Sequence, residues 1–281
     1  MGWLRKTFSD DCVAALLLAA FYPVWKYCGS RWIANDETAA CLPLLLILFM
    51  WIRRMYGIGR LGAGEDAAHR LGRADFLAMS AMLGIYILAY HHTFMLLRAI
   101  IALTVLGIVF SRRLKGRIID VSVFGLLFLS LPAIPTAQFY FGYPLRVIVA
   151  KSSSALLGML SYDVSSSGTS IFWDGKCISV DAPCSGIRML YAGVLLVLLL
   201  GYFRNLSLKG LCLLALAGTV AVIFGNVVRA TVLFFTETGI VAFGRDFLHT
   251  AIGISVFIWI AAGIYVISEW LVKRRETCIA V

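Results

Sequence analysis

The sequence predicts an all-α polytopic membrane protein, with about eight transmembrane helices and a small extracytoplasmic β-hairpin. Its composition is the first reason: 61% of the residues are hydrophobic and only 14% are charged, whereas soluble domains are about a quarter charged. The second reason is spacing, because apolar stretches recur at roughly the 20-residue length that crosses a bilayer. The net charge of +10 does not indicate a nucleic-acid partner, because the basic residues lie in short segments between the apolar stretches.

The positions of the basic segments predict the topology. Lys and Arg are enriched in cytoplasmic loops, and a cytoplasmic N-terminus places every basic cluster on one side. We expect spans at about 12–29, 38–52, 74–91, 93–111, 118–141, 185–203, 208–236 and 249–271. The basic clusters are Arg5 and Lys6; Arg53, Arg54, Arg60, Arg70 and Arg73; Arg112, Arg113, Lys115 and Arg117; Arg204 and Lys209; and Lys273, Arg274 and Arg275. Both termini are then cytoplasmic, and residues 142–184 and 237–249 face outward.

The long outward segment contains the predicted β-hairpin. Residues 170–173 and 176–180 favour strands, and Asp174-Gly175 between them is typical of a two-residue type I′ turn. Ahead of the hairpin, residues 145–160 have apolar residues at helical spacing, with Lys151 and a serine run on the other face. This pattern is typical of a helix lying along the membrane interface.

Cys184 is the first candidate for chemistry, since it follows the hairpin where the chain re-enters the membrane. Pro183 before it and Ser185-Gly186 after it predict a position at or near the first turn of the sixth span. The unpaired N–H groups and partial positive charge of a helix N-terminus favour a thiolate there. The competing interpretation is a structural cysteine, because most free cysteines in apolar sequence act as small hydrophobes.

Arg229 is the second candidate, because an arginine inside an apolar segment is costly unless it faces protein or a water-filled cavity. Asn226 adds a polar group one turn earlier on the same helix face. A structural ion pair with Glu237 or Asp181, or snorkelling to the interface, is the competing interpretation. Arg98 is also predicted to be intramembrane, and we assign no chemistry to it.

His249 is the third candidate, at the outer end of the last span. Gly253, one turn later, would let a second helix or a substrate approach closely. Taken alone, a histidine at this position is more often an ordinary interfacial residue than a catalyst. A thiol, an imidazole and a guanidinium together, however, are what nucleophilic acyl transfer requires. Asp181 is a candidate for orienting His249 or pairing with an arginine.

Other patterns point to no further site. Residues 57–62 match G-x-G-x-x-G, but this run follows a membrane span and not a strand, so we reject a nucleotide site. The seven cysteines contain no C-x-x-C pair and no zinc-like spacing. The sequence therefore predicts no metal and no cofactor.

In these motifs the sequence resembles the exosortase/archaeosortase family of membrane cysteine transpeptidases. The resemblance rests on the runs Ala182-Pro183-Cys184-Ser185-Gly186-Ile187 and Asn226-Val227-Val228-Arg229, and on His249 followed by Gly253. It covers about residues 117–271, so we divide the chain into an N-terminal four-helix transmembrane region (1–116) and an exosortase-like catalytic transmembrane region (117–281).

The resemblance implies that Cys184, Arg229 and His249 are catalytic. Asn226, Ser185, Gly186, Asp181 and Gly253 are the supporting residues. It also implies that the substrates are exported proteins with a C-terminal sorting tail, made of a short motif, a transmembrane helix and a basic cluster. Their new carboxyl end would pass to water or to a lipid or polysaccharide acceptor. We expect an enzyme of the cytoplasmic (inner) membrane, surrounded by membrane lipids, with its active site at the extracytoplasmic face.

Two non-enzymatic interpretations stay open. One is a transporter or flippase-like subunit that uses Arg229 as an anion site, and it predicts flux that survives Cys184→Ala. The other is a scaffold of an envelope-assembly system, in which none of the three residues matters beyond folding.

Overall fold

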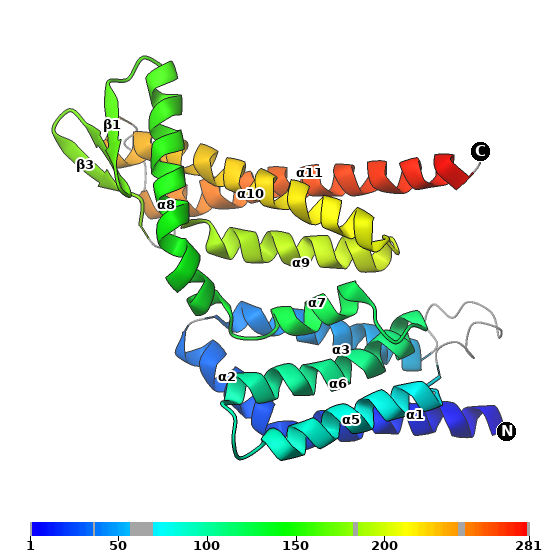
Figure 1. Cartoon of the computed structure of the whole chain (residues 1–281). Helices are drawn as coiled ribbons and strands as arrows, with labels where there is room; N and C mark the ends of the chain where they lie inside the picture. The colour runs from blue at the N-terminus through cyan, green and yellow to red at the C-terminus, as the bar shows by residue number, and fades with distance from the viewer. Residues whose placement is uncertain (1, 36, 57–69, 182–184, 241–244, 280–281) are drawn as a thin grey trace. The chain divides into compact units, whose positions relative to one another are not determined.

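The computed structural model describes residues 2–35, 37–56, 70–181, 185–240 and 245–279. The chain is mostly helical and divides into two compact units (Figure 1), which we call the N-terminal unit (residues 1–133) and the C-terminal unit (residues 134–281). The described helices of the N-terminal unit are α1 (Gly2–Ala20), α2 (Tyr22–Ala34), η1 (Thr38–Cys41), α3 (Leu42–Met55), α5 (Arg73–Ala89), α6 (Met95–Lys115) and α7 (Val121–Leu129).

Helix α6 is the centre of the N-terminal unit and packs against α1, α2, α3, α5 and α7. Leu103, Leu106 and Phe110 on this helix are fully buried. The helix ends at Gly116, whose φ of 69° lies in the left-handed region where glycine carries no Cβ penalty.

Two buried carboxylates of the N-terminal unit, Asp11 and Asp75, are paired with arginines. Arg113 donates two hydrogen bonds to Asp11, of 3.0 Å and 2.8 Å, and Trp51 Nε1 donates to the same carboxylate at 3.0 Å. Arg112 donates to both oxygens of Asp75, which is fully buried, at 2.9 and 3.0 Å. Such two-pronged contacts satisfy the carboxylate oxygens that burial removes from water.

The elements of the C-terminal unit are α8 (Ile134–Met159), β1 (Val164–Ser167), β2 (Ser170–Trp173), β3 (Lys176–Ser179), α9 (Ile187–Phe203), α10 (Leu208–Glu237) and α11 (Arg245–Ile279). Helix α10 packs against α8, α9 and α11. Glycines allow the close approach of α11: a Cβ on Gly225 would come within 2.4 Å of Ile260, and one on Gly218 within 3.4 Å of Ile264. The two helices are therefore antiparallel, so the end of α10 lies beside the start of α11.

The predicted hairpin is confirmed and belongs to a larger sheet. Strands β2 and β3 are antiparallel, with Trp173 opposite Lys176, and the turn residues Asp174 and Gly175 have φ of 46° and 69°, as a type I′ turn requires. The unpredicted strand β1 pairs with β2, and the sheet order is β1-β2-β3. A second two-residue turn joins these strands through Gly168, with φ of 58°.

An aromatic cluster fixes the sheet on the helices. Trp173 of β2 packs edge-on against Phe234 of α10, with ring centroids 5.6 Å apart, and Tyr162 contacts both rings. Ile171 of β2 is buried in the same core as Leu157 of α8. The sheet is thus held over the end of α10, and its position sets the walls of the candidate site.

Among the described residues, four stretches are long and apolar enough to cross a membrane: Thr38–Met55, Met95–Lys115, Leu208–Glu237 and Leu248–Arg274. The number rises to six if each of two bent helix pairs, α1 with α2 and α7 with α8, is one span. Helices α5 and α9 have 17 residues each, or about 26 Å, which is shorter than the roughly 30 Å hydrocarbon core. A multi-pass membrane protein is supported, and eight spans remain a prediction.

Two predicted spans are broken in the structure. The first breaks at Phe21, where Pro23 begins α2, because proline lacks the N–H that would continue the preceding helix. The fifth breaks after Leu129, near Pro132. The interfacial helix expected at residues 145–160 is the continuation of α8, and two of its serines are buried: Ser153 donates to Val227 O of α10 at 3.2 Å and Ser154 is 9% exposed.

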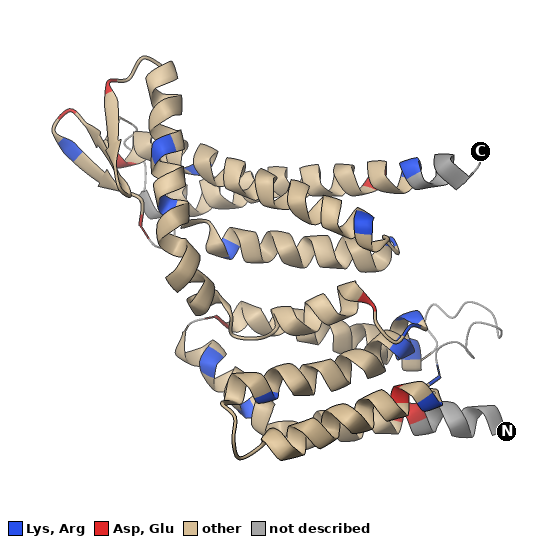
Figure 2. Cartoon of the chain, viewed as in Figure 1, with Lys and Arg blue, Asp and Glu red and all other residues tan. Residues whose placement is uncertain are grey.

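In α9, α10 and α11 most charged residues lie towards the helix ends, whereas α8 has Arg146 and Lys151 in its middle (Figure 2). At the end where α9 finishes and α10 begins, Arg204 pairs with Glu269 of α11 at 2.5 Å and lies over the Tyr265 ring at 4.8 Å. This is the end predicted to be cytoplasmic, and that assignment remains a prediction.

Candidate functional site

Arg229 and His249 lie together at the opposite end of the C-terminal unit. Arg229 is on α10, about two turns before the helix ends at Glu237, and His249 is near the start of α11. Arg229 Nη2 lies 3.5 Å from His249 Nε2, the long limit of a hydrogen bond. A guanidinium can only donate, so Nε2 is the acceptor in this contact.

The guanidinium of Arg229 is incompletely satisfied. Its Nε is buried and has no hydrogen-bond partner among the described residues, where the contact to His249 is its one hydrogen bond. Leaving a buried donor unpaired costs about 1–3 kcal/mol, and more for a charged group. The structural ion pairs that could have explained this arginine, with Glu237 or Asp181, are not formed. An anionic or carbonyl oxygen supplied by a ligand would satisfy the free N–H.

Gly253 leaves room for this guanidinium on α11. A Cβ built on it would lie 3.4 Å from Arg229 Nε and 3.7 Å from Cζ. The guanidinium therefore lies beside α11 at Gly253, where a Cβ would make ordinary van der Waals contact with it and cover Nε. The prediction that Gly253 permits a close approach is consistent with this contact, and the approaching group is Arg229.

The start of α9 is held by residues on two other helices. Gly186 precedes the helix with φ of 83°, and a Cβ on it would come within 2.9 Å of the Asn226 amide on α10. Ser185, 2% exposed, donates to Gln138 Oε1 of α8 at 2.8 Å and accepts from Ile187 N at 3.4 Å. These contacts fix the chain immediately after Cys184, which itself lies outside the described residues. Helix α9 begins at Ile187, three residues after the candidate nucleophile.

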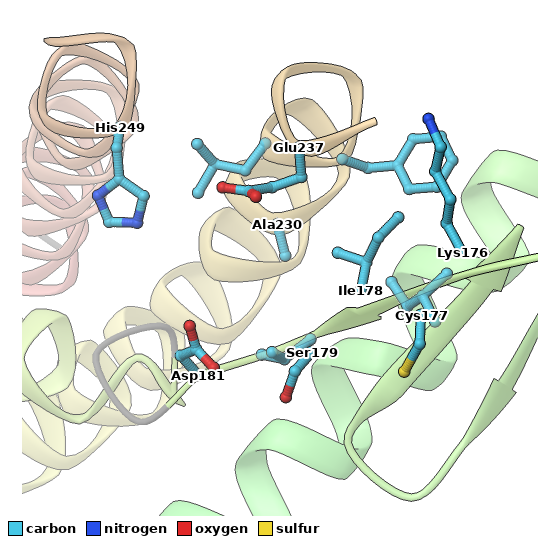
Figure 3. Close-up of a pocket in the computed structure, with 12 residues that line it drawn as sticks. Lys176, Cys177, Ile178, Ser179, Asp181, Ala230, Glu237 and His249 are labelled. Atoms are coloured by element: carbon cyan, nitrogen blue, oxygen red, sulfur yellow. The ribbon is translucent and has the colours of Figure 1, made fainter. Parts of the chain in front are cut away.

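A cavity of about 690 Å³ opens beside His249. Figure 3 shows His249 on α11 at one side of it and strand β3 at the other, with Glu237 and Ala230 of α10 between them. Lys176 bridges β3 to the end of α10 by donating to Thr238 O at 3.0 Å. The size is typical of a ligand site, and the walls combine apolar side chains with charged ones.

The structure thus brings together Arg229, His249 and Gly253 as one group, and Ser185, Gly186 and Asn226 as a second. Asp181 is exposed and lines the same cavity as His249, which leaves its role in orienting the histidine a prediction. Sequence reasoning missed Gln138, although an amide inside the apolar run 118–141 was a visible signal. It also missed the cavity-lining roles of Lys176 and Glu237, which depend on how the sheet packs against α10.

Comparison with known proteins identifies the family. The family model described as transmembrane exosortase (Exosortase_EpsH) matches residues 12–266, and so reaches into the N-terminal unit, beyond the region where motifs were visible. No curated protein and no solved structure matches the chain. Since the match covers well over half of the sequence, the chain belongs to the transmembrane exosortase family.

Proposed function

We propose that this protein is a membrane-embedded cysteine protease or transpeptidase that cleaves the C-terminal sorting tails of exported proteins. The observation that carries the proposal is the Arg229 guanidinium, which lies beside the His249 imidazole and keeps a buried N–H without a partner. Family membership and the position of Cys184, immediately before the anchored start of α9, support a thiol as the third member. The active site would face the outside of the cytoplasmic membrane.

The first half of the reaction forms a thioester. Neutral His249 takes the proton of the Cys184 thiol, and the thiolate attacks the carbonyl carbon of the scissile peptide bond. As the C–S bond forms, the negative charge on the carbonyl oxygen is held by the free N–H of Arg229. The C–N bond then breaks, and His249 gives its proton to the leaving amine, which departs with the transmembrane part of the tail.

The second half releases the product. An amine on an acceptor, or water, attacks the thioester while His249 takes its proton, and the Cys184 thiolate leaves. With an amine, the exported protein becomes linked through a new amide; with water, it is released as a carboxylic acid. A lipid or polysaccharide is the acceptor class that the family resemblance implies, and either would carry the product to the cell surface.

The test is processing of a co-expressed reporter. The reporter carries a C-terminal tail from the same genome, with a motif, a transmembrane helix and a basic cluster, and cleavage is followed by gel shift. Wild type should cleave it, and Cys184→Ala at the same membrane level should not. Cys212→Ala is the matched control, because Cys212 is an exposed thiol near the start of α10, and it should process normally.

Equal cleavage by wild type and Cys184→Ala would remove Cys184 as the nucleophile. The transporter interpretation predicts anion flux that survives Cys184→Ala and is lost in Arg229→Met. The scaffold interpretation predicts that Cys184→Ala, Arg229→Met and His249→Ala all keep wild-type processing when they fold normally.

A further inference from the structure

One edge of the sheet has no partner strand among the described residues. The strand order β1-β2-β3 makes β3 an edge strand, with one side paired to β2. An edge presents unpaired N–H and C=O groups, which is how many proteins bind an extended peptide as an added strand.

The backbone groups that face this edge follow from the pairing. Val180 N donates to Thr169 O at 2.9 Å, so the groups of residue 180 point towards β2. Antiparallel partners alternate between hydrogen-bonded and non-bonded pairs, so Ile178 also points towards β2. The N–H and C=O groups of Cys177 and Ser179 therefore point the other way, to the free edge.

The free edge borders the cavity beside His249. The cavity is lined by six consecutive residues, 176–181. Side chains alternate between the two faces of a strand, so one face alone would line a cavity with every second residue. A continuous run indicates that the backbone of the edge strand contributes to the wall, together with Ile171 of β2 (Figure 3). The opposite wall is formed by Ala230, Glu237 and His249.

We propose that β3 binds the extended segment preceding the substrate's transmembrane helix, as a fourth strand paired to Cys177 and Ser179. Strand β3 spans four residues, or about 13 Å, so it would pair with a segment of about four residues. Strand β3 ends at Ser179, five residues before Cys184 in the sequence.

This inference rests on the proposed function and adds how the substrate is held. Two residues offer only a few main-chain hydrogen bonds, each contributing about 0.5–1.5 kcal/mol. A substrate anchored in the same membrane has a high effective concentration at the site, so a weak edge contact is sufficient. Main-chain pairing would also orient the scissile bond while leaving side-chain recognition to the cavity walls.

The native thiol of Cys177 allows a direct test, because its side chain is exposed. Single cysteines are placed one at a time along the reporter segment that precedes the transmembrane helix, and disulfide formation with the enzyme is induced by an oxidant. The enzyme carries Cys184→Ala, so that crosslinking does not depend on cleavage. A disulfide needs Cα atoms about 4.4–6.8 Å apart. The substrate residue directly opposite Cys177 on a paired strand meets this limit. The residues before and after it have side chains on the other face of the strand and do not form the disulfide.

The expected result is one strongly crosslinked position, weaker crosslinks two residues away on either side, and none at the positions between. Cys177→Ser should abolish all of them. Crosslinks at consecutive positions, crosslinks that survive Cys177→Ser, or no crosslinks at all would overturn the inference. Failure of the proposed function is distinguishable, because it appears as processing that does not require Cys184.

A second variant tests the edge without using the thiol. Ser179→Pro removes one N–H that points to the free edge, a position where strands tolerate proline. Ser166→Pro is the matched control on β1: Ser166 pairs with Ile171, whose backbone groups point to β3, so its own N–H faces away from the sheet. Processing should fall roughly fivefold in Ser179→Pro and stay unchanged in Ser166→Pro. Equal processing by both variants would contradict the strand-addition geometry.

Discussion

Two arginines of the N-terminal unit, Arg112 and Arg113, differ from Arg229 of the C-terminal unit in the partners that meet their charge. In the N-terminal unit, Arg112 and Arg113 each meet a buried carboxylate through two donors. In the C-terminal unit, Arg229 contacts the His249 imidazole and keeps a buried Nε that has no partner among the described residues. Ion pairs between buried side chains hold helices together. A buried charge without a partner lowers stability, and it is expected where a bound substrate supplies the missing partner.

Arg98 shows that an apolar segment alone does not make an arginine functional. Its guanidinium donates twice to Thr93 O, at 3.0 and 2.7 Å, and lies 4.8 Å from the Tyr90 ring centroid. These local contacts at the start of α6 use two of its N–H donors, including Nε, and place the guanidinium over an aromatic ring. Arg98 and Arg229 therefore differ in the groups that accept their hydrogen bonds, and those groups cannot be read from the sequence.

The largest expected effect is on the stability of the N-terminal unit. Arg113→Met leaves Asp11 as a buried, unpaired carboxylate and should destabilise the protein by about 3–5 kcal/mol, seen as a lower unfolding temperature in detergent. Adding Asp11→Asn should recover much of this loss, because it removes the stranded charge and keeps an acceptor for Trp51. Arg53→Met, at an exposed position on α3, is the control; a double variant as unstable as the single one would contradict the pairing argument.

Arg229→Met should show the reverse pattern. Folding should be nearly preserved, because the side chain lost was never fully satisfied, while reporter processing should fall by about 10²–10³. Unfolding temperature and processing are measured on the same membrane preparations. A strongly destabilised Arg229→Met that still processes the reporter in proportion to its folded fraction would place this arginine with Arg113, as a structural residue.

A smaller effect is expected at the start of α9. Gly186→Ala forces a side chain into a left-handed conformation, costing about 1–2 kcal/mol, and pushes a methyl group against Asn226. Asn226→Ala in the same chain should relieve the clash and leave the conformational cost. Thermal unfolding of the two single variants and the double variant separates these contributions; full recovery in the double variant would show that the backbone conformation is not strained.

The smallest expected effect is the difference between alanine substitutions at two glycines on α11. Gly263→Ala places a methyl group in open space and should stabilise the helix by up to about 1 kcal/mol. Gly253→Ala gains the same helix propensity but puts its methyl group 3.4 Å from Arg229 Nε, so processing should fall although the fold is kept. Equal processing by the two variants, measured with the same reporter, would show that the space over Nε is not used.

Local signals predicted the parts of the structure that depend on local geometry. Asp174-Gly175 sets the turn between β2 and β3 by its own backbone preferences, and that hairpin was correct to within a residue. Strand β1 was missed because Val164–Ser167 is polar and lacks the apolar alternation that marks a strand. The break after Leu129 was missed because a hydropathy pattern reports apolar length and not helix direction.

The residues of the candidate site could be predicted from the sequence, but the contacts between them could not. Arg229 and His249 stood out because polar groups are costly in apolar sequence, and the antiparallel packing of α10 and α11 brings them together. The Gly186–Asn226 and Ser185–Gln138 contacts join distant segments of the chain, so no local pattern displays them. The cavity likewise depends on a sheet whose third strand was not foreseen.

The most direct measurement is acid quenching of the reporter reaction, followed by mass spectrometry of enzyme peptides. We predict a fragment of the reporter attached through a thioester to Cys184 in the wild type, and a loss of this adduct in Arg229→Met, because the oxyanion is no longer stabilised. An adduct on another residue, or an equal yield on Cys184 in both proteins, would show that the unpaired arginine of the C-terminal unit is not part of the chemistry.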